Sequence, residues 1–143
     1  MERLPDSAYV FRLVPPDNEC YYDSDKGLPH PLAFTLSSDD RKECPPRLSV
    51  FDVERTSLHE AKQIRCANEH VIGFKLPVNG IRALRRGSDG IPKLDVVRDP
   101  LDVELPGADG HCGIIGLGRK SGEKRRDFKE LRWELRELCK PLD

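Results

Sequence analysis

The C-terminal segment carries the pattern that most constrains the fold of this chain. Over residues 121–140, SGEKRRDFKELRWELRELCK, the apolar residues follow one another at spacings of three, four and three: Phe128, Leu131, Leu135 and Leu138. That is the period of one helical face, and Ser121 stands where an N-cap oxygen accepts from the first free backbone N–H groups. The pattern predicts an amphipathic helix that packs its apolar face on the rest of the protein.

Short runs rich in β-branched and aromatic residues mark six candidate strands ahead of this helix, from which a sheet of about five is expected. The candidate strands lie at 8–14, 32–36, 47–53, 70–76, 93–97 and 111–117. Pro15 and Pro16 end the first of them, and the polar segment 37–46 is expected to be a connection.

Two more helices are predicted between the strands. Ser57, followed three residues later by Glu60, forms a capping box ahead of apolar residues at helical spacing. Pro77 stands at the first position of a short helix that Gly87 closes. The order strand, helix, strand around the first of these helices fits either a β-α-β unit or the alternation of an α+β domain.

With 143 residues, the chain is long enough to bury one continuous core. We therefore expect a single α+β domain over 1–143. Its core would be a single mixed β-sheet of about five short strands, covered by two or three helices, with the C-terminal helix packed on it. Acidic stretches that contain Pro and Gly predict long loops near 15–31 and 98–110.

Charge is balanced over the whole chain and uneven along it. The chain has 24 Lys and Arg against 25 Asp and Glu, which gives no global field for nucleic acid or anionic lipid. Residues 1–30 hold three basic against six acidic groups, a net charge of −3, and residues 119–140 hold nine against five, a net of +4. Two poles of opposite sign favour a protein that docks a partner or a second copy of itself.

The five cysteines are scattered and never form a CxxC motif, and the four histidines avoid metal-ligand spacing. We therefore expect no metal site and no cofactor. The first residues lack the apolar core of a signal peptide, and no apolar run reaches the roughly 18–20 residues that span a bilayer. These features predict reduced thiols, a cytoplasmic location and no membrane partner.

One catalytic hypothesis rests on Arg12, Ser49 and Glu104, which follow one another on or near predicted strands. This order suits ADP-ribosyl transfer from NAD. The arginine would grip a phosphate, the serine would steady the ribose, and the glutamate would stabilise the developing cation. Tyr21 and Tyr22, in the first long loop, would stack on the nicotinamide.

His111 and Cys112 are adjacent, but neighbouring residues of a strand point to opposite faces. They therefore cannot pair as base and thiol nucleophile, and Cys112 is expected to be a small core residue.

A second hypothesis concerns the glycine-rich connection before the last helix. Residues 113–121, GIIGLGRKS, approach a phosphate-binding P-loop, but arginine occupies the lysine position and few residues follow. Arg119, Lys120 and Ser121 at a helix start instead favour a simple anion, such as a nucleic-acid phosphate. That contact is the nucleic-acid alternative.

No catalytic motif stands out, so the leading hypothesis is a small cytosolic interaction protein or accessory subunit. It would bind a protein partner, or itself, through its charged poles and long loops, using Lys124, Arg125, Arg126, Tyr21 and Tyr22. The alternatives are a NAD- or nucleotide-processing enzyme and the phosphate binder.

Overall fold

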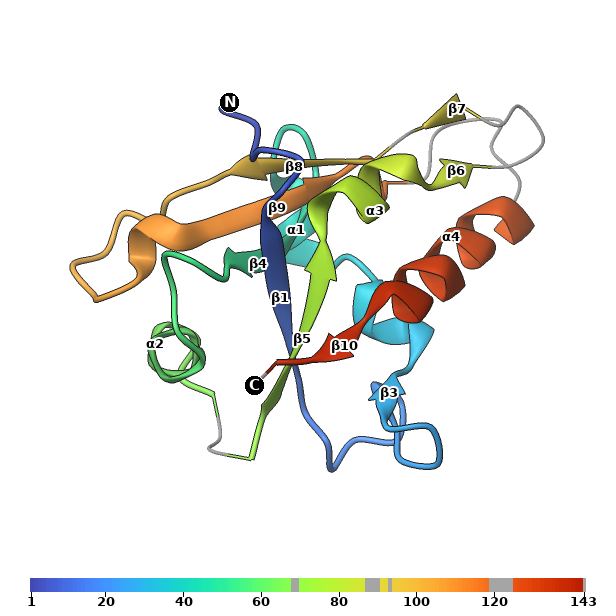
Figure 1. The fold of residues 1–143 in the computed structure, drawn as a ribbon, viewed down its shortest axis with the longest axis horizontal. Helices are drawn as coiled ribbons and strands as arrows, with labels where there is room; N and C mark the ends of the chain where they lie inside the picture. The colour runs from blue at the N-terminus through green and yellow to red at the C-terminus, as the bar shows by residue number, and fades with distance from the viewer. Residues whose placement is uncertain (68–69, 87–90, 93, 119–124, 143) are drawn as a thin grey trace.

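The computed structural model describes residues 1–67, 70–86, 91–92, 94–118 and 125–142 (Figure 1). Its centre is a six-stranded sheet in the order β10-β5-β1-β4-β9-β8, and every pairing between described strands is antiparallel. The strands are β1 (Tyr9–Val14), β4 (Arg47–Asp52), β5 (Ile72–Pro77), β8 (Asp95–Arg98), β9 (His111–Ile115) and β10 (Lys140–Pro141). Two small hairpins pair β2 (Tyr22–Asp23) with β3 (Leu28–Pro29) and β6 (Arg85–Arg86) with β7 (Ile91–Pro92).

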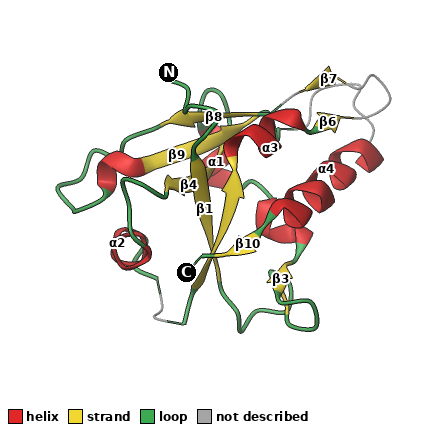
Figure 2. Ribbon diagram, viewed as in Figure 1, coloured by secondary structure: helices red, strands yellow, loops and turns green. Residues whose placement is uncertain are grey.

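The helices are short except for the last one (Figure 2). They are α1 (Ser38–Lys42), α2 (Leu58–Ile64), α3 (Val78–Ala83) and α4 (Arg125–Leu138), with the 3₁₀ turns η1 (Pro31–Phe34) and η3 (Ala108–Gly110). None of the helices in these ranges is both long enough and apolar enough to span a bilayer. The α+β class predicted from the sequence is therefore confirmed.

The sequence left open whether α2 belongs to a β-α-β unit or to the alternation of helices and strands in an α+β domain. Both β4 and β5 pair with β1 in antiparallel fashion, so they run parallel to each other with β1 between them. The helix α2 thus joins two strands that are not neighbours, which fits the second arrangement. The sheet is antiparallel at its described pairings, where a mixed sheet was expected.

Three local predictions differ from the structure. Residues 32–36 form no strand, because Pro31 starts the turn η1 and the His30 side chain accepts a hydrogen bond from the Leu32 N–H. The expected connection 37–46 contains α1, since Ser37 and Asp40 form a capping box. The long loop 15–31 holds the β2–β3 hairpin. Gly87, the expected end of the helix that begins at Pro77, lies outside the described residues, and α3 ends at Ala83.

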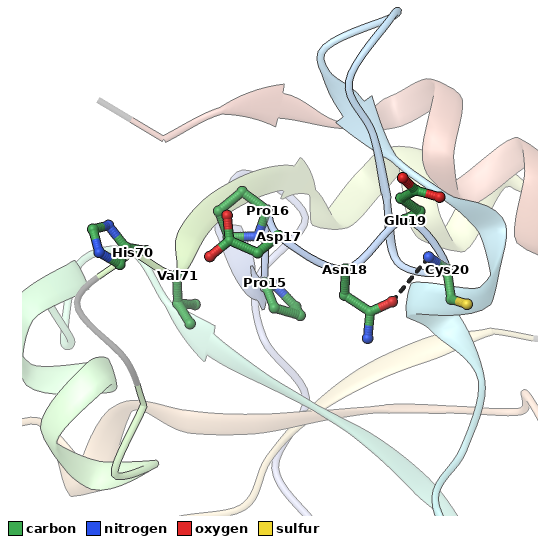
Figure 3. Close-up of a pocket in the computed structure, with 8 residues that line it drawn as sticks. All are labelled: Pro15, Pro16, Asp17, Asn18, Glu19, Cys20, His70 and Val71. Carbon is green, nitrogen blue, oxygen red and sulfur yellow. Dashed lines mark hydrogen bonds between the residues drawn. The ribbon is translucent and has the colours of Figure 1, made fainter.

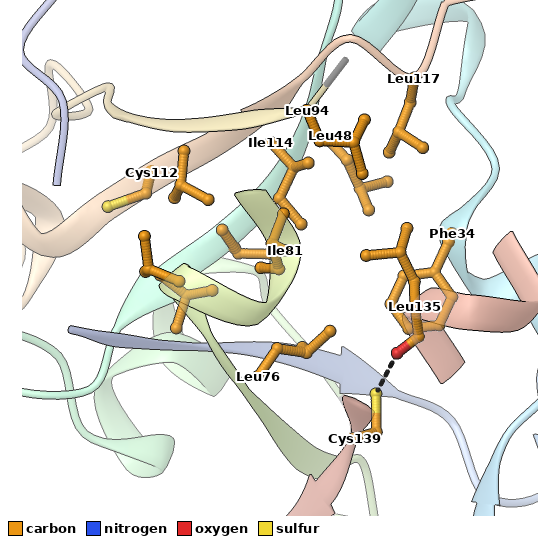
Figure 4. Packing of buried hydrophobic residues seen from close by; sticks show 14 of the residues in the cluster. Phe34, Leu48, Leu76, Ile81, Leu94, Cys112, Ile114, Leu117, Leu135 and Cys139 are labelled. Atoms are coloured by element: carbon orange, nitrogen blue, oxygen red, sulfur yellow. Dashed lines mark hydrogen bonds between the residues drawn. The ribbon is translucent and has the colours of Figure 1, made fainter. Parts of the chain in front are cut away.

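The main core lies between the sheet and a layer formed by η1, α3 and α4 (Figure 4). Leu131 and Leu135 of α4 are fully buried in it, and Leu138 packs against its edge. Burying one such leucine contributes about 1.5–3 kcal/mol. The prediction that the C-terminal helix packs on the sheet is therefore confirmed; the side chain of Phe128 lies outside the described part.

The opposite face of the sheet carries a smaller apolar cluster. Phe11 of β1 and Phe51 of β4 stack with their ring centroids 5.6 Å apart, and Ala61 of α2 covers them. This cluster is centred on β1 and β4. Polar side chains of β4 and β9 occupy the same face beside it.

The N-terminal segment lines the free edge of β8. Arg3 forms a β-bridge with Val97, and the Leu4 N–H donates to the Val96 carbonyl. Arg82 of α3 fixes this segment by donating to the Leu4 carbonyl and by pairing with Asp95. The N-terminal residues therefore protect an edge strand that would otherwise present unpaired backbone groups.

Candidate active site

Ser49 and His111 form a close side-chain contact on the face of the sheet that α2 covers. The register places Phe51 opposite His111 and Ser49 opposite Gly113. Residues two apart on a strand share a face, so Ser49, Phe51 and His111 point the same way. Ser49 Oγ lies 2.6 Å from His111 Nε2, and both residues are buried.

The second ring nitrogen of His111 fixes the direction of this hydrogen bond. His111 Nδ1 lies 2.7 Å from the backbone oxygen of Asp99 and 3.6 Å from its carboxylate. A carbonyl oxygen only accepts hydrogen bonds, so Nδ1 carries the proton and Nε2 is the acceptor. The Ser49 hydroxyl therefore donates to Nε2, which is the arrangement of a serine nucleophile with its general base.

The surroundings of His111 favour its neutral form. Burial lowers the pKa of His111 below its ordinary value of 6.5, and the nearby charges of Arg65 and Arg47 act in the same direction. The Asp99 backbone oxygen and carboxylate oppose this shift without reversing it. The Phe51 ring meets the imidazole edge-on, with 5.3 Å between centroids. An imidazole that is neutral at pH 7 is able to take up a proton.

We expect this lowered pKa to make stability depend on pH. The unfolded chain binds a proton at His111 near pH 6.5, whereas the folded chain binds it only at lower pH, so stability falls as the pH drops below 6.5. The loss should be about 1.4 kcal/mol for each unit between the two pKa values. Urea denaturation at pH 7.5 and 5.5 measures it, with His111→Gln as the control that lacks the titrating group. Equal losses in both proteins would contradict the assignment.

Arg47 holds Asp99 in place beside the histidine. Its Nη1 lies 3.1 Å from Asp99 Oδ1, and its Nε donates to the Pro45 carbonyl. The aliphatic part of Arg47 lies flat across Gly113, where a Cβ atom would come within 2.9 Å of the Arg47 Cβ. Glycine is needed at this position because the arginine occupies the space of a side chain.

Replacing Gly113 by alanine should therefore displace Arg47 and loosen Asp99. We expect Gly113→Ala to cost about 1–3 kcal/mol of stability, the usual effect of overpacking. Gly118→Ala is the matched control, because its Cβ would meet only Pro46 at 3.8 Å, an ordinary contact. Urea denaturation of both variants tests this. Equal stability of the two variants would show that Arg47 is not held against the sheet.

Ser49 also lines a cavity of about 400 Å³ between the end of β1, β4, α1 and the segment after α2. Its wall consists of Arg12, Leu13, Pro15, Ser37, Asp39, Asp40, Ser49, Phe51, Arg65, Ala67 and Val71. The serine hydroxyl is thus placed between a buried base and a space large enough for a small ligand.

Arg12 reaches this cavity because the ladder between β1 and β4 stops early. The two strands pair at Val10 and Phe11 and separate beyond them. Arg12 Nη1 then donates to the Ser49 carbonyl at 2.7 Å, in place of a backbone N–H, and Nε donates to the Ala33 carbonyl at 2.9 Å. Burial lowers the pKa of Arg12 to about 10, so the guanidinium remains charged at neutral pH.

The structure brings two of the three residues of the ADP-ribosyl-transfer hypothesis together. Arg12 and Ser49 line the same cavity, whereas Glu104 is exposed in the connection between β8 and η3 and is not part of that wall. Tyr21 is exposed and lines a neighbouring hollow. Tyr22 is half-buried, with its ring 6.2 Å from that of Phe74.

The predicted basic sites lie largely outside the described part of the chain. This applies to the proposed anion site and to one partner-binding residue: Arg119, Lys120, Ser121 and Lys124. Arg125 and Arg126 begin α4, but their side chains are not described. Within the described ranges, no cluster of three or more His, Cys, Asp and Glu side chains is arranged to hold a metal ion.

Neither the pairing of Ser49 with His111 nor the role of Asp99 was predicted from the sequence. The side chains of His111 and Cys112 point to opposite faces of the sheet, as expected. Cys112 is buried in the main core, and burial raises the pKa of its thiol to about 12, so it carries no thiolate at neutral pH. The only signal in the sequence was that Ser49 and His111 each lie in a predicted strand, 47–53 and 111–117; nothing in it indicated that these strands pair.

Compared with known proteins, the chain matches no protein-family model, no curated protein and no solved structure.

Proposed function

We propose that the protein is a serine hydrolase, in which Ser49 is the nucleophile and His111 its general base. The observation that supports this most strongly is the 2.6 Å contact from Ser49 Oγ to an imidazole nitrogen that lacks a proton. The serine also lines a cavity, where a substrate carbonyl has access to it.

The reaction follows from these positions. Ser49 Oγ attacks the carbonyl carbon of an ester, and Nε2 of His111 takes the hydroxyl proton. The carboxylate of Asp99, 3.6 Å from Nδ1, stabilises the imidazolium. When the carbon–oxygen bond breaks, the imidazolium gives the proton to the leaving alcohol. A water molecule then repeats the same steps on the acyl-serine and releases the acid.

Arg12 would stabilise the negative charge that develops on the carbonyl oxygen. Its Nη1 donates to the Ser49 carbonyl oxygen, so the guanidinium charge is fixed next to the backbone of the nucleophile, in the wall of the same cavity. A positive group that is already in place before the reaction stabilises the transition state without reorganisation.

Hydrolysis of p-nitrophenyl acetate tests this proposal. The pure protein should release nitrophenolate above the rate of buffer, and Ser49→Ala should lose that excess. Ser7→Ala is the matched control, because Ser7 is exposed in a turn before β1. If Ser49→Ala hydrolyses the ester as fast as the wild type, the proposal is wrong.

We also propose that the protein associates with a second copy of itself in the cytoplasm. All five cysteines are unpaired, which suits a reducing compartment. Trp133 on α4 is 49% exposed; its ring centroid lies 5.0 Å from the Arg136 guanidinium carbon and 6.3 Å from the centroid of the His30 ring. Tryptophans are enriched at the centres of protein interfaces. The acidic first thirty residues and the basic C-terminal segment of two copies would attract each other.

Sedimentation at low and high salt tests this second proposal. We expect a dimer that weakens with salt and is lost in Trp133→Ser. Val103→Ser serves as the control, since Val103 is equally exposed, at 49%, in a different segment. A monomer under all conditions would contradict self-association.

A further inference from the structure

A second hollow lies against the Ser49 cavity. It has a volume of about 270 Å³ and shares five wall residues with that cavity: Arg12, Leu13, Pro15, Ser37 and Asp40. The remaining wall comes from the loop before β2 and from η1 with the residues after it: Tyr21, Leu32, Ala33, Thr35 and Leu36. The two hollows are therefore neighbours that meet at Arg12, and the second one has a mainly apolar end.

We propose that this apolar hollow binds the acyl group of the substrate, a hydrocarbon or aromatic group of roughly eight carbons. The inference rests on the proposed function, because it takes Ser49 as the site of attack. The size follows from the volume, since a water-sized group takes up about 30 Å³ and the hollow offers about 270 Å³.

Arg12 belongs to the walls of both hollows. Its Nη1 donates to the Ser49 carbonyl oxygen and its Nε to the Ala33 carbonyl oxygen, so its guanidinium connects the backbone of the nucleophile to the wall of the apolar hollow. A carbonyl group held beside the guanidinium at Ser49 would extend its acyl chain along Ala33 and Leu36. The wall of the Ser49 cavity carries two cationic side chains, Arg12 and Arg65, and two carboxylates, Asp39 and Asp40, so the junction does not require an anionic substrate.

A third hollow beside Pro15 does not suit an acyl chain. It measures about 570 Å³ and borders the Ser49 cavity at Pro15 and Val71 (Figure 3). Its wall includes the carboxylates of Asp17 and Glu19. Placing a hydrocarbon against charged groups that need water is unfavourable. In the hollow at Leu32 the charged residues, Arg12 and Asp40, belong to the wall shared with the Ser49 cavity, and the remaining wall carries no charged residue, so this hollow is the better acyl site.

Two measurements test the inference. First, the kcat/KM of the wild type for p-nitrophenyl octanoate should be at least ten times its kcat/KM for p-nitrophenyl acetate. Leu32→Asp places a carboxylate at the exposed rim of the hollow and should lower that ratio at least tenfold. Leu105→Asp is the matched control, because Leu105 is 45% exposed and Leu32 is 41% exposed.

Second, calorimetry with octanoate and acetate separates the hollow from the reaction. Ser49→Ala cannot form an acyl-serine, yet it should bind octanoate saturably and acetate at least tenfold more weakly. The double variant Ser49→Ala/Leu32→Asp should lose octanoate binding. If octanoate binds while the wild type hydrolyses no ester, the serine hydrolase proposal fails and the apolar site stands. If octanoate does not bind Ser49→Ala, the acyl site is wrong whatever the wild type hydrolyses.

Discussion

His111→Gln should lower the kcat/KM of ester hydrolysis by about two to four orders of magnitude, the usual contribution of a general base. The glutamine amide is able to hydrogen-bond to Ser49, but it cannot take the hydroxyl proton. Because polarity and approximate size are kept, the sheet should stay folded, and circular dichroism checks this. A rate within twofold of the wild type would show that the contact between Ser49 and His111 is only structural.

Asp99→Asn is the informative companion to this variant. In serine hydrolases whose aspartate carboxylate accepts the imidazole N–H, the equivalent change produces the wrong tautomer and costs about 10⁴-fold. Here the Asp99 backbone oxygen is the acceptor at 2.7 Å, and the carboxylate lies 3.6 Å away. The backbone keeps the proton on Nδ1 in the variant. We therefore expect Asp99→Asn to lose no more than about tenfold, and a loss as large as that of His111→Gln would contradict this geometry.

Leu135→Asp should abolish cooperative unfolding. Leu135 is completely buried in the main core between α4 and the sheet. The variant loses about 1.5–3 kcal/mol of apolar burial and adds the larger cost of an unpaired carboxylate in an apolar site. The sum approaches the whole net stability of a domain of this size, about 5–15 kcal/mol.

Thermal unfolding followed by far-UV circular dichroism measures this effect. Glu134→Asp is the matched control on the same helix, because Glu134 is exposed and its charge is kept. We expect an unchanged melting temperature for the control and no sharp transition for Leu135→Asp. If Leu135→Asp melts at the same temperature as the wild type, α4 does not pack on the main core through Leu135.

The parts of the fold that local patterns determine could be predicted from the sequence. The spacing of Leu131, Leu135 and Leu138 reports directly on which side of a helix is buried, and the capping box at Ser57 marks where α2 begins. Residues 32–36 were mistaken for a strand because their side chains suit one. They form a 3₁₀ turn instead, because Pro31 and the cap at His30 favour the start of such a turn.

The pairing of the strands could not be predicted from the sequence, and neither could most of the candidate site. Ser49 and His111 are 62 positions apart, and they meet because β4 and β9 pair in one particular register. A shift of one residue would turn His111 to the other face of the sheet. Arg12 reaches Ser49 only because β1 leaves β4 after Phe11, which no local pattern indicates.

Reaction of the intact protein with an alkyl fluorophosphonate tests the central claim most directly. These reagents phosphonylate serines that a neighbouring base activates, and fluoride leaves as the bond to Oγ forms. Mass spectrometry of the whole protein, followed by peptide mapping, should show a single adduct on Ser49 and none in His111→Gln under the same conditions. A wild-type protein that remains unmodified, or one that is modified at a serine other than Ser49, would contradict the account.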